Sequence, residues 1–163
     1  MPNDQDTDAY AVVCFRLDGR WEVEVLPEAL TGDLRGLVAA VASQPGEHGA
    51  FALVDVADEF FVVVRVQEGR PRVLLSDVTA ATEWELAAQV LDHLGLDVPV
   101  DDQDQQVLPA GDLGVFEDMG LDAAEMGAIL SDLDAYADEM LAVLARRLGF
   151  GHRFERVVDA IMG

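Results

Sequence analysis

The sequence predicts an α+β fold in which helices cover an antiparallel sheet of five strands. The first observation behind this prediction is a set of closely spaced apolar, β-branched runs, at Phe51–Val56, Phe60–Val66 and Val73–Leu75. The turns between these runs are too short to contain a parallel crossover, so the runs form an antiparallel meander. The second observation is apolar residues at helical spacing before and after the meander, and throughout the chain from Asp112 onward.

The residues before the meander predict a hairpin and a helix. Tyr10–Arg16 and Trp21–Val25 are strands joined by a tight Asp-Gly turn. The second strand alternates apolar and acidic residues, so we expect it to be half-exposed and near an edge. Leu34–Ser43 carries one apolar stripe at helical spacing, with Thr31 or Asp33 as its N-cap.

The meander differs from the hairpin because both faces of its first two strands are apolar. Both faces of the sheet centre should therefore be covered. A helix follows over Val78–Leu94, with Ser76-Asp77 at its N-cap position and Gly95 as its stop. The resulting order is ββαβββα, which is also the order in roadblock and longin-like domains. That similarity concerns architecture alone and predicts no function.

The C-terminal part predicts three helices. They cover Ala123–Leu130, the residues from a cap at Asp134 to Leu148, and the final amphipathic stretch that contains Phe154. We expect part of their apolar stripe to pack on the sheet or its helices. The chain then divides into a sheet domain at 1–95, an acidic linker at 96–111 and a helical segment at 112–163.

The charge of the chain is strongly negative, at −22, and all ten basic residues are arginines. Seventeen Asp and Glu residues, and no basic residue, lie between Arg72 and Arg146. Such a field repels phosphate backbones, so we expect no direct binding of nucleic acid, and it attracts basic proteins or cations. A solvated acidic face that keeps the protein soluble explains the same pattern.

The sequence also predicts a cytoplasmic protein without membrane contact. Its apolar runs are shorter than the roughly 18 residues that span a bilayer. The N-terminus has no basic region followed by an apolar one, as a secretory signal would. The single cysteine, Cys14, excludes a disulfide within the chain and is expected to be a small buried residue.

Neither a metal site nor a cofactor site is recognisable in the sequence, so we expect no cofactor. Zinc sites need converging Cys, His or carboxylate ligands, whereas His48, His93 and His152 lie far apart along the chain. The chain contains no lysine, which excludes a phosphate-binding loop of the usual kind.

Carboxylates near the meander are the remaining candidates. Asp55 lies inside an apolar strand, so it should pair with Arg65 on the neighbouring strand or point outward at the sheet end. Asp55, Asp58, Glu59 and Asp77 cluster along the meander, and a cleft with carboxylates near Asp55 and Asp77 would suit an enzyme. A turn also explains Asp58 and Glu59, and a helix cap explains Asp77. Trp84 lies between Glu83 and Glu85, and an aromatic residue beside acids suits a partner interface unless it packs in the core. The candidate interaction surface consists of Asp77, Glu83, Trp84 and Glu85.

The run FFVVVRVQEGRPRVLLSDVTAA from Phe60, together with Leu148-Gly149-Phe150 and the closing helix, resembles the bacterial tRNA adenosine deaminase-associated proteins. The resemblance covers most of the chain from Tyr10 onward and is weakest at 96–111. It implies a role beside a tRNA adenosine deaminase and provides no catalytic residues to carry over.

The chain does not itself contain the deaminase signature. A zinc deaminase needs His-x-Glu and Pro-Cys-x-x-Cys, and here the three histidines lack the glutamate and there is one cysteine. Our main hypothesis is a non-catalytic accessory protein whose partner is a tRNA adenosine deaminase or another basic protein. The alternatives are a structural homodimer through a sheet edge or face, and an enzyme that uses the carboxylates of Asp55 and Asp77.

Overall fold

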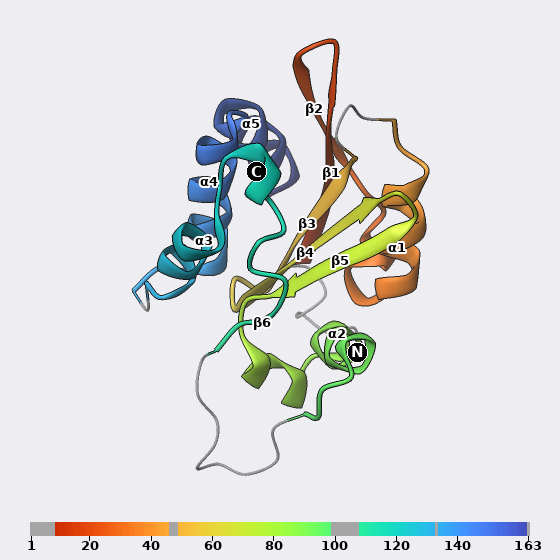
Figure 1. The fold of residues 1–163 in the computed structure, drawn as a ribbon, viewed down its shortest axis with the longest axis vertical. Helices are drawn as coiled ribbons and strands as arrows, with labels where there is room; N and C mark the ends of the chain where they lie inside the picture. The colour runs from red at the N-terminus through yellow and green to blue at the C-terminus, as the bar shows by residue number, and fades with distance from the viewer. Residues whose placement is uncertain (1–8, 46–48, 99–107, 133, 163) are drawn as a thin grey trace.

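The computed structural model describes residues 9–45, 49–98, 108–132 and 134–162, and an antiparallel sheet organises them (Figure 1). The sheet has the strand order β2-β1-β3-β4-β5-β6. Its strands are β1 Ala9–Leu17, β2 Arg20–Val25, β3 Phe51–Val56, β4 Phe60–Gln67, β5 Arg70–Leu75 and β6 Ala110–Gly111. The α-helices are α1 Leu34–Ala42, α2 Glu85–Leu94, α3 Ala123–Leu130, α4 Ala137–Leu148 and α5 Gly151–Met162.

The α+β class and the antiparallel sheet are confirmed, but the prediction of five strands is wrong. The sixth strand is β6, which pairs with the end of β5. Two residues carry no periodic signal, and Ala110–Gly111 lies in the stretch that the sequence marks as a linker. Gly111 allows this pairing, since its φ is +105° and a Cβ there would clash with the carbonyl oxygen of Val73. Residues 99–107 of the predicted linker lie outside the described residues.

Helices cover both faces of the sheet, as the apolar strands require. Alternate residues of β3 and β4 face α1 and α2 on one side and the C-terminal helices α3, α4 and α5 on the other (Figure 1). The expected packing of the C-terminal stripe is confirmed, because Leu141, Leu144 and Phe154 are buried in the second of these cores. No helix in the described ranges has the length and apolarity to cross a membrane.

The single helix predicted over Val78–Leu94 is wrong. Asp77 caps a short 3-10 helix, Val78–Thr82, and α2 begins only after Trp84, whose backbone is extended at φ −120° and ψ 126°. The indole of Trp84 hydrogen-bonds Glu59 of the β3–β4 turn. This bond joins residues far apart in the sequence, so helical periodicity could not reveal the interruption.

The predicted cap of α4 is also wrong. The helix begins at Ala137, with Tyr136 at the N-cap in place of Asp134. The backbone N–H of Asp138, in its first turn, donates to the carboxylate of Asp58 in the β3–β4 turn at 2.8 Å. The start of α4 is therefore fixed by the sheet. The caps predicted at Asp33 and Asp122 are confirmed.

Candidate functional site

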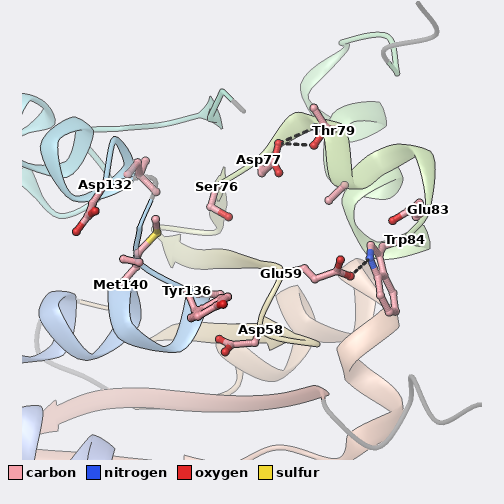
Figure 2. A pocket seen from close by; sticks show the side chains of 14 residues that line it. Asp58, Glu59, Ser76, Asp77, Thr79, Glu83, Trp84, Asp132, Tyr136 and Met140 are labelled. Carbon is pink, nitrogen blue, oxygen red and sulfur yellow. Dashed lines mark hydrogen bonds between the residues drawn. The ribbon is translucent and has the colours of Figure 1, made fainter. Parts of the chain in front are cut away.

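A cleft of about 320 Å³ lies where the β3–β4 turn, the 3-10 helix before α2 and the start of α4 meet (Figure 2). Carboxylates come into it from the β3–β4 turn, from both ends of the 3-10 helix and from the loop before α4, and none of the described residues that line it is basic. The lining carboxylates are Asp58, Glu59, Asp77, Glu83 and Asp132. Uncompensated carboxylates of this density create a negative potential that attracts cationic groups.

Ser76 and Asp77 line one wall of the cleft, where Ser76 ties the end of β5 to β4 and Asp77 caps the 3-10 helix that follows. The Ser76 hydroxyl accepts a hydrogen bond from the backbone N–H of Phe61 at 2.9 Å. One carboxylate oxygen of Asp77 accepts from the backbone N–H of Thr79 at 2.9 Å and from its hydroxyl at 2.7 Å. This is the capping role that the sequence predicts for Asp77, and it leaves the other carboxylate oxygen available toward the cleft.

Two aromatic side chains lie at the cleft rim. Trp84 is half-buried, and its indole N–H donates to Glu59 Oε2 at 3.0 Å. Tyr136 precedes α4 and is 65% exposed. Figure 2 shows these rings on different segments of the rim, with the Met140 thioether and Ser76 also facing the cleft. The site thus offers aromatic and apolar surface beside its negative charge.

Asp58 connects the β3–β4 turn to helix α4. Its φ of +59° belongs to the tight turn, and its side chain accepts from the Asp138 N–H. Its carbonyl oxygen accepts from the N–H of Ala137 at 3.4 Å. The first N–H groups of a helix lack partners inside the helix and favour negative charge, so the turn stabilises the start of α4. The cleft walls are consequently held together.

Asp55 supports this connection from beneath. It is 3% exposed, and its carboxylate accepts from the backbone N–H of Asp58 at 3.0 Å. Burial, followed by the negative charge of Asp58, raises the pKa of Asp55 to about 7. Burial and the nearby Asp55 also raise the pKa of the Tyr10 hydroxyl far above its ordinary value.

The expected pairing of Asp55 with Arg65 is wrong. In the β3–β4 register Asp55 lies opposite Phe61 and Arg65 lies opposite Phe51, at the other end of β3. Four residues of strand, about 13 Å, separate the two positions. Arg65 is fully buried and makes a two-point ion pair with Asp118, at 2.7 and 2.9 Å. The hydrogen bonds from Arg65 lower the pKa of Asp118.

The structure brings together three of the four residues proposed as an interaction surface. Asp77, Glu83 and Trp84 line the cleft, whereas Glu85 lies in the first turn of α2 and is not among the lining residues. Sequence reasoning missed Asp132 and Tyr136, which come from the loop before α4. In the sequence these two residues are marked only by the acidic and aromatic composition of that loop. The composition does not indicate which surface of the protein the loop contacts.

The site offers binding chemistry more readily than catalysis. Asp55, the carboxylate whose pKa is raised to about 7, is not among the residues that line the cleft. Asp77 lines it but is engaged in capping. The described residues contain no group of three or more His, Cys, Asp or Glu side chains placed to hold a metal ion. His48 lies outside the described residues.

Replacing Asp55 with Asn should make the protein more stable at pH 8 than the wild type. The folded-state pKa, about 7, lies above the ordinary value of 3.8, so between these values the folded state binds more protons than the unfolded state. The contribution of Asp55 to stability therefore falls as the pH rises from 4 to 7, by at most about 1.4 kcal/mol per pH unit. Asn at position 55 can still accept the hydrogen bond from the Asp58 N–H. Because it carries no charge, the variant avoids the cost of burying a carboxylate at pH 8.

Urea unfolding of both proteins between pH 4 and 8 measures this difference. We expect the advantage of the variant to shrink steadily toward pH 4. The exposed Asp92, changed to Asn, serves as the control for losing one negative charge. A difference between D55N and the wild type that stays constant over this pH range would contradict the prediction.

The comparisons with known proteins agree on one family. The family model for Rv3753c-like tRNA adenosine deaminase-associated proteins matches residues 9–151. Protein Rv3753c of Mycobacterium tuberculosis strain H37Rv is 40% identical over 156 residues, which cover 94% of this chain and 90% of that protein. No solved structure matches the chain, so its similarity to roadblock and longin-like domains stays a prediction. The chain belongs to the family of Rv3753c-like tRNA adenosine deaminase-associated proteins.

Proposed function

We propose that this protein is a non-catalytic accessory protein that binds a tRNA adenosine deaminase through the acidic cleft. The description of the family names a tRNA adenosine deaminase as the associated enzyme. The observation that carries the proposal is the cleft itself, in which five carboxylates and two aromatic rings meet without a basic residue among the described lining. We place the protein in the cytoplasm together with this partner.

The cleft suits an arginine or lysine side chain of the partner. A guanidinium group can hydrogen-bond carboxylates such as Glu83 and Asp132 while its flat face stacks on an aromatic ring. Trp84 and Tyr136 offer such rings at the rim, and Met140 supplies an apolar contact for the aliphatic part of the side chain. Aromatic residues and methionine are enriched in interfaces between proteins.

The surface of an enzyme that binds tRNA is basic where it meets the phosphates. An acidic cleft that docks on that surface competes with tRNA. Electrostatic attraction between an acidic and a basic surface makes association fast. Salt weakens this attraction, because the Debye length falls to about 8 Å at physiological ionic strength. We therefore expect binding that both salt and tRNA reduce.

Titrating the protein into the deaminase of the same organism, with and without tRNA, tests this proposal at about 50 mM and 200 mM salt. The double variant Glu59→Gln, Glu83→Gln should weaken binding by about tenfold or more, which corresponds to about 1.4 kcal/mol. The glutamine at position 59 can still accept the Trp84 N–H. The matched control, Glu22→Gln with Glu24→Gln, removes the same charge from β2 and should retain most of the affinity.

The outcomes separate the alternatives. Binding that survives high salt and saturating tRNA would exclude the competing geometry, and an absence of binding at low salt would refute the proposal. A carboxylate enzyme is less well supported, because its two candidate residues do not meet in the cleft. The homodimer stays a prediction, which sedimentation of the purified protein would test.

A further inference from the structure

A groove of the opposite charge lies at the edge of the sheet, between strand β2 and helix α5, which lie side by side (Figure 1). It consists of two hollows of about 470 and 380 Å³ that share Arg153. Arg20 and Arg146 line one hollow and Arg156 lines the other. Among the described residues that line the two hollows there is no carboxylate, although the chain carries a net charge of −22.

The floor of the groove is apolar. Trp21, Val23 and Val25 alternate along β2 and line the hollows beside α5. Val25 is 55% exposed, which is high for a valine on a strand. From α5, Val157 lines the same hollow as the two valines of β2. An exposed apolar strip edged by charges of one sign is a feature of interaction surfaces.

The arginines of the groove are positioned by the fold. Helix α4 ends at Gly149 with φ +104°, and α5 begins two residues later. A Cβ at Gly151 would clash with the Cγ of Arg146, so the glycine lets the aliphatic part of this arginine lie against the start of α5. Arg153 lies 3.8 Å from Glu22, a long contact between half-exposed groups that a closer carboxylate can replace.

We propose that this groove binds an extended acidic segment of a partner protein. Its carboxylates would meet Arg20, Arg153 and Arg156, and an apolar side chain would rest on Val25 and Val157. In the described sheet β2 has a neighbouring strand, β1, on one side only. An extended segment can therefore lie along an open strand edge, a known mode of peptide recognition.

The charge distribution favours a short acidic peptide over nucleic acid and over a second copy of this chain. A nucleic acid strand carries a charge at every nucleotide and extends beyond the groove over an acidic surface, whereas a short peptide confines its charges to the arginines. A symmetric dimer through the β2 edge would bring Arg153 and Arg156 of one copy toward the same residues of the other. Such like-charge contacts disfavour association.

Fluorescence anisotropy of a labelled synthetic peptide of alternating aspartate and valine tests the groove at low salt. We expect saturable binding to the full chain that falls about tenfold or more in the double variant Arg153→Gln, Arg156→Gln. The control variant Arg35→Gln, Arg70→Gln removes two exposed arginines that do not line the groove and should leave binding unchanged. A second peptide, with glycine in place of valine, should bind more weakly because it cannot use the apolar floor.

Several results would overturn the proposal. These are no binding of the aspartate-valine peptide, an equal loss in the control variant, or equal binding of the glycine peptide. Tighter binding of single-stranded polyuridylate than of the peptide, lost in the Arg153 and Arg156 variant, would assign the groove to nucleic acid. This assay does not involve the deaminase, so its failure is distinguishable from failure of the acidic-cleft proposal.

Discussion

A fragment that ends at Gly111 is expected to aggregate instead of folding. The C-terminal helices cover the centre of one face of the sheet, and their removal exposes large apolar side chains that are almost fully buried in the intact protein. An uncovered apolar face of this kind is an aggregation liability. The deletion also removes Asp118, the ion-pair partner of the buried Arg65. The newly exposed side chains include Tyr10, Val12, Phe51, Leu53, Phe61, Val63 and Leu74.

The measurement is the soluble fraction and sedimentation profile of the fragment, compared with the full chain under the same conditions. The full chain should unfold cooperatively in urea, and the fragment should show no cooperative transition. A fragment of residues 1–111 that stays soluble and unfolds cooperatively would show that the N-terminal part folds by itself, and would contradict the expectation.

Changing Asp118 to Ala should lower the free energy of unfolding by about 3 kcal/mol, since removing one partner of an ion pair is strongly destabilising when the other charge is buried. That other charge is Arg65, whose side chain has no exposure, whereas the Asp118 side chain is 45% exposed. The guanidinium carbon also lies 5.8 Å from the ring centre of Phe116, so an apolar ring forms part of its surroundings. Urea unfolding at pH 7 measures the loss.

A matched control is Glu125→Ala, which also removes the carboxylate of a two-point arginine pair. Its partner, Arg147, is half-exposed and can be solvated after the change, so stability should change little. The pKa of Asp118 is lowered in the folded state, so its stabilising effect is present at neutral pH and is lost as the pH falls through that lowered pKa. Equal losses in the two variants would contradict the role of burial.

The parts of the fold that the sequence predicted correctly depend on short-range patterns. The Asp-Gly turn of the first hairpin has positive φ at both residues, which is what that dipeptide favours. Apolar residues on both faces of Phe51–Val56 predicted a covered strand, and all six of its residues are buried. Asp33, Asp77 and Asp122 cap the helical segments that follow them, because the carboxylate bonds an N–H only two or three residues away.

The incorrect predictions concern residues whose partners lie far along the chain. Asp55 and Arg65 face the same side of the sheet, but the register places them at opposite ends of β3. Each is instead connected with a C-terminal segment, Arg65 with Asp118 directly and Asp55 through Asp58 with the start of α4. Nothing local in the sequence indicates either contact.

The candidate site divides in the same way. Asp77, Glu83 and Trp84 stood out in the sequence because an aromatic residue lies among acids within one short segment. Asp132 and Tyr136 joined them only after the sheet and α4 packed together.

By itself the sequence determined the α+β class, the meander, the acidic character and the family of this protein, because periodicity, turn chemistry and composition act over a few residues. Tertiary structure alone decided the sixth strand, the break before α2, the partner of Arg65 and the two grooves of opposite charge. Each of these depends on contacts between residues far apart in the chain, which form only when the helices and the sheet pack together, and that packing is set by the shape and burial of the whole core.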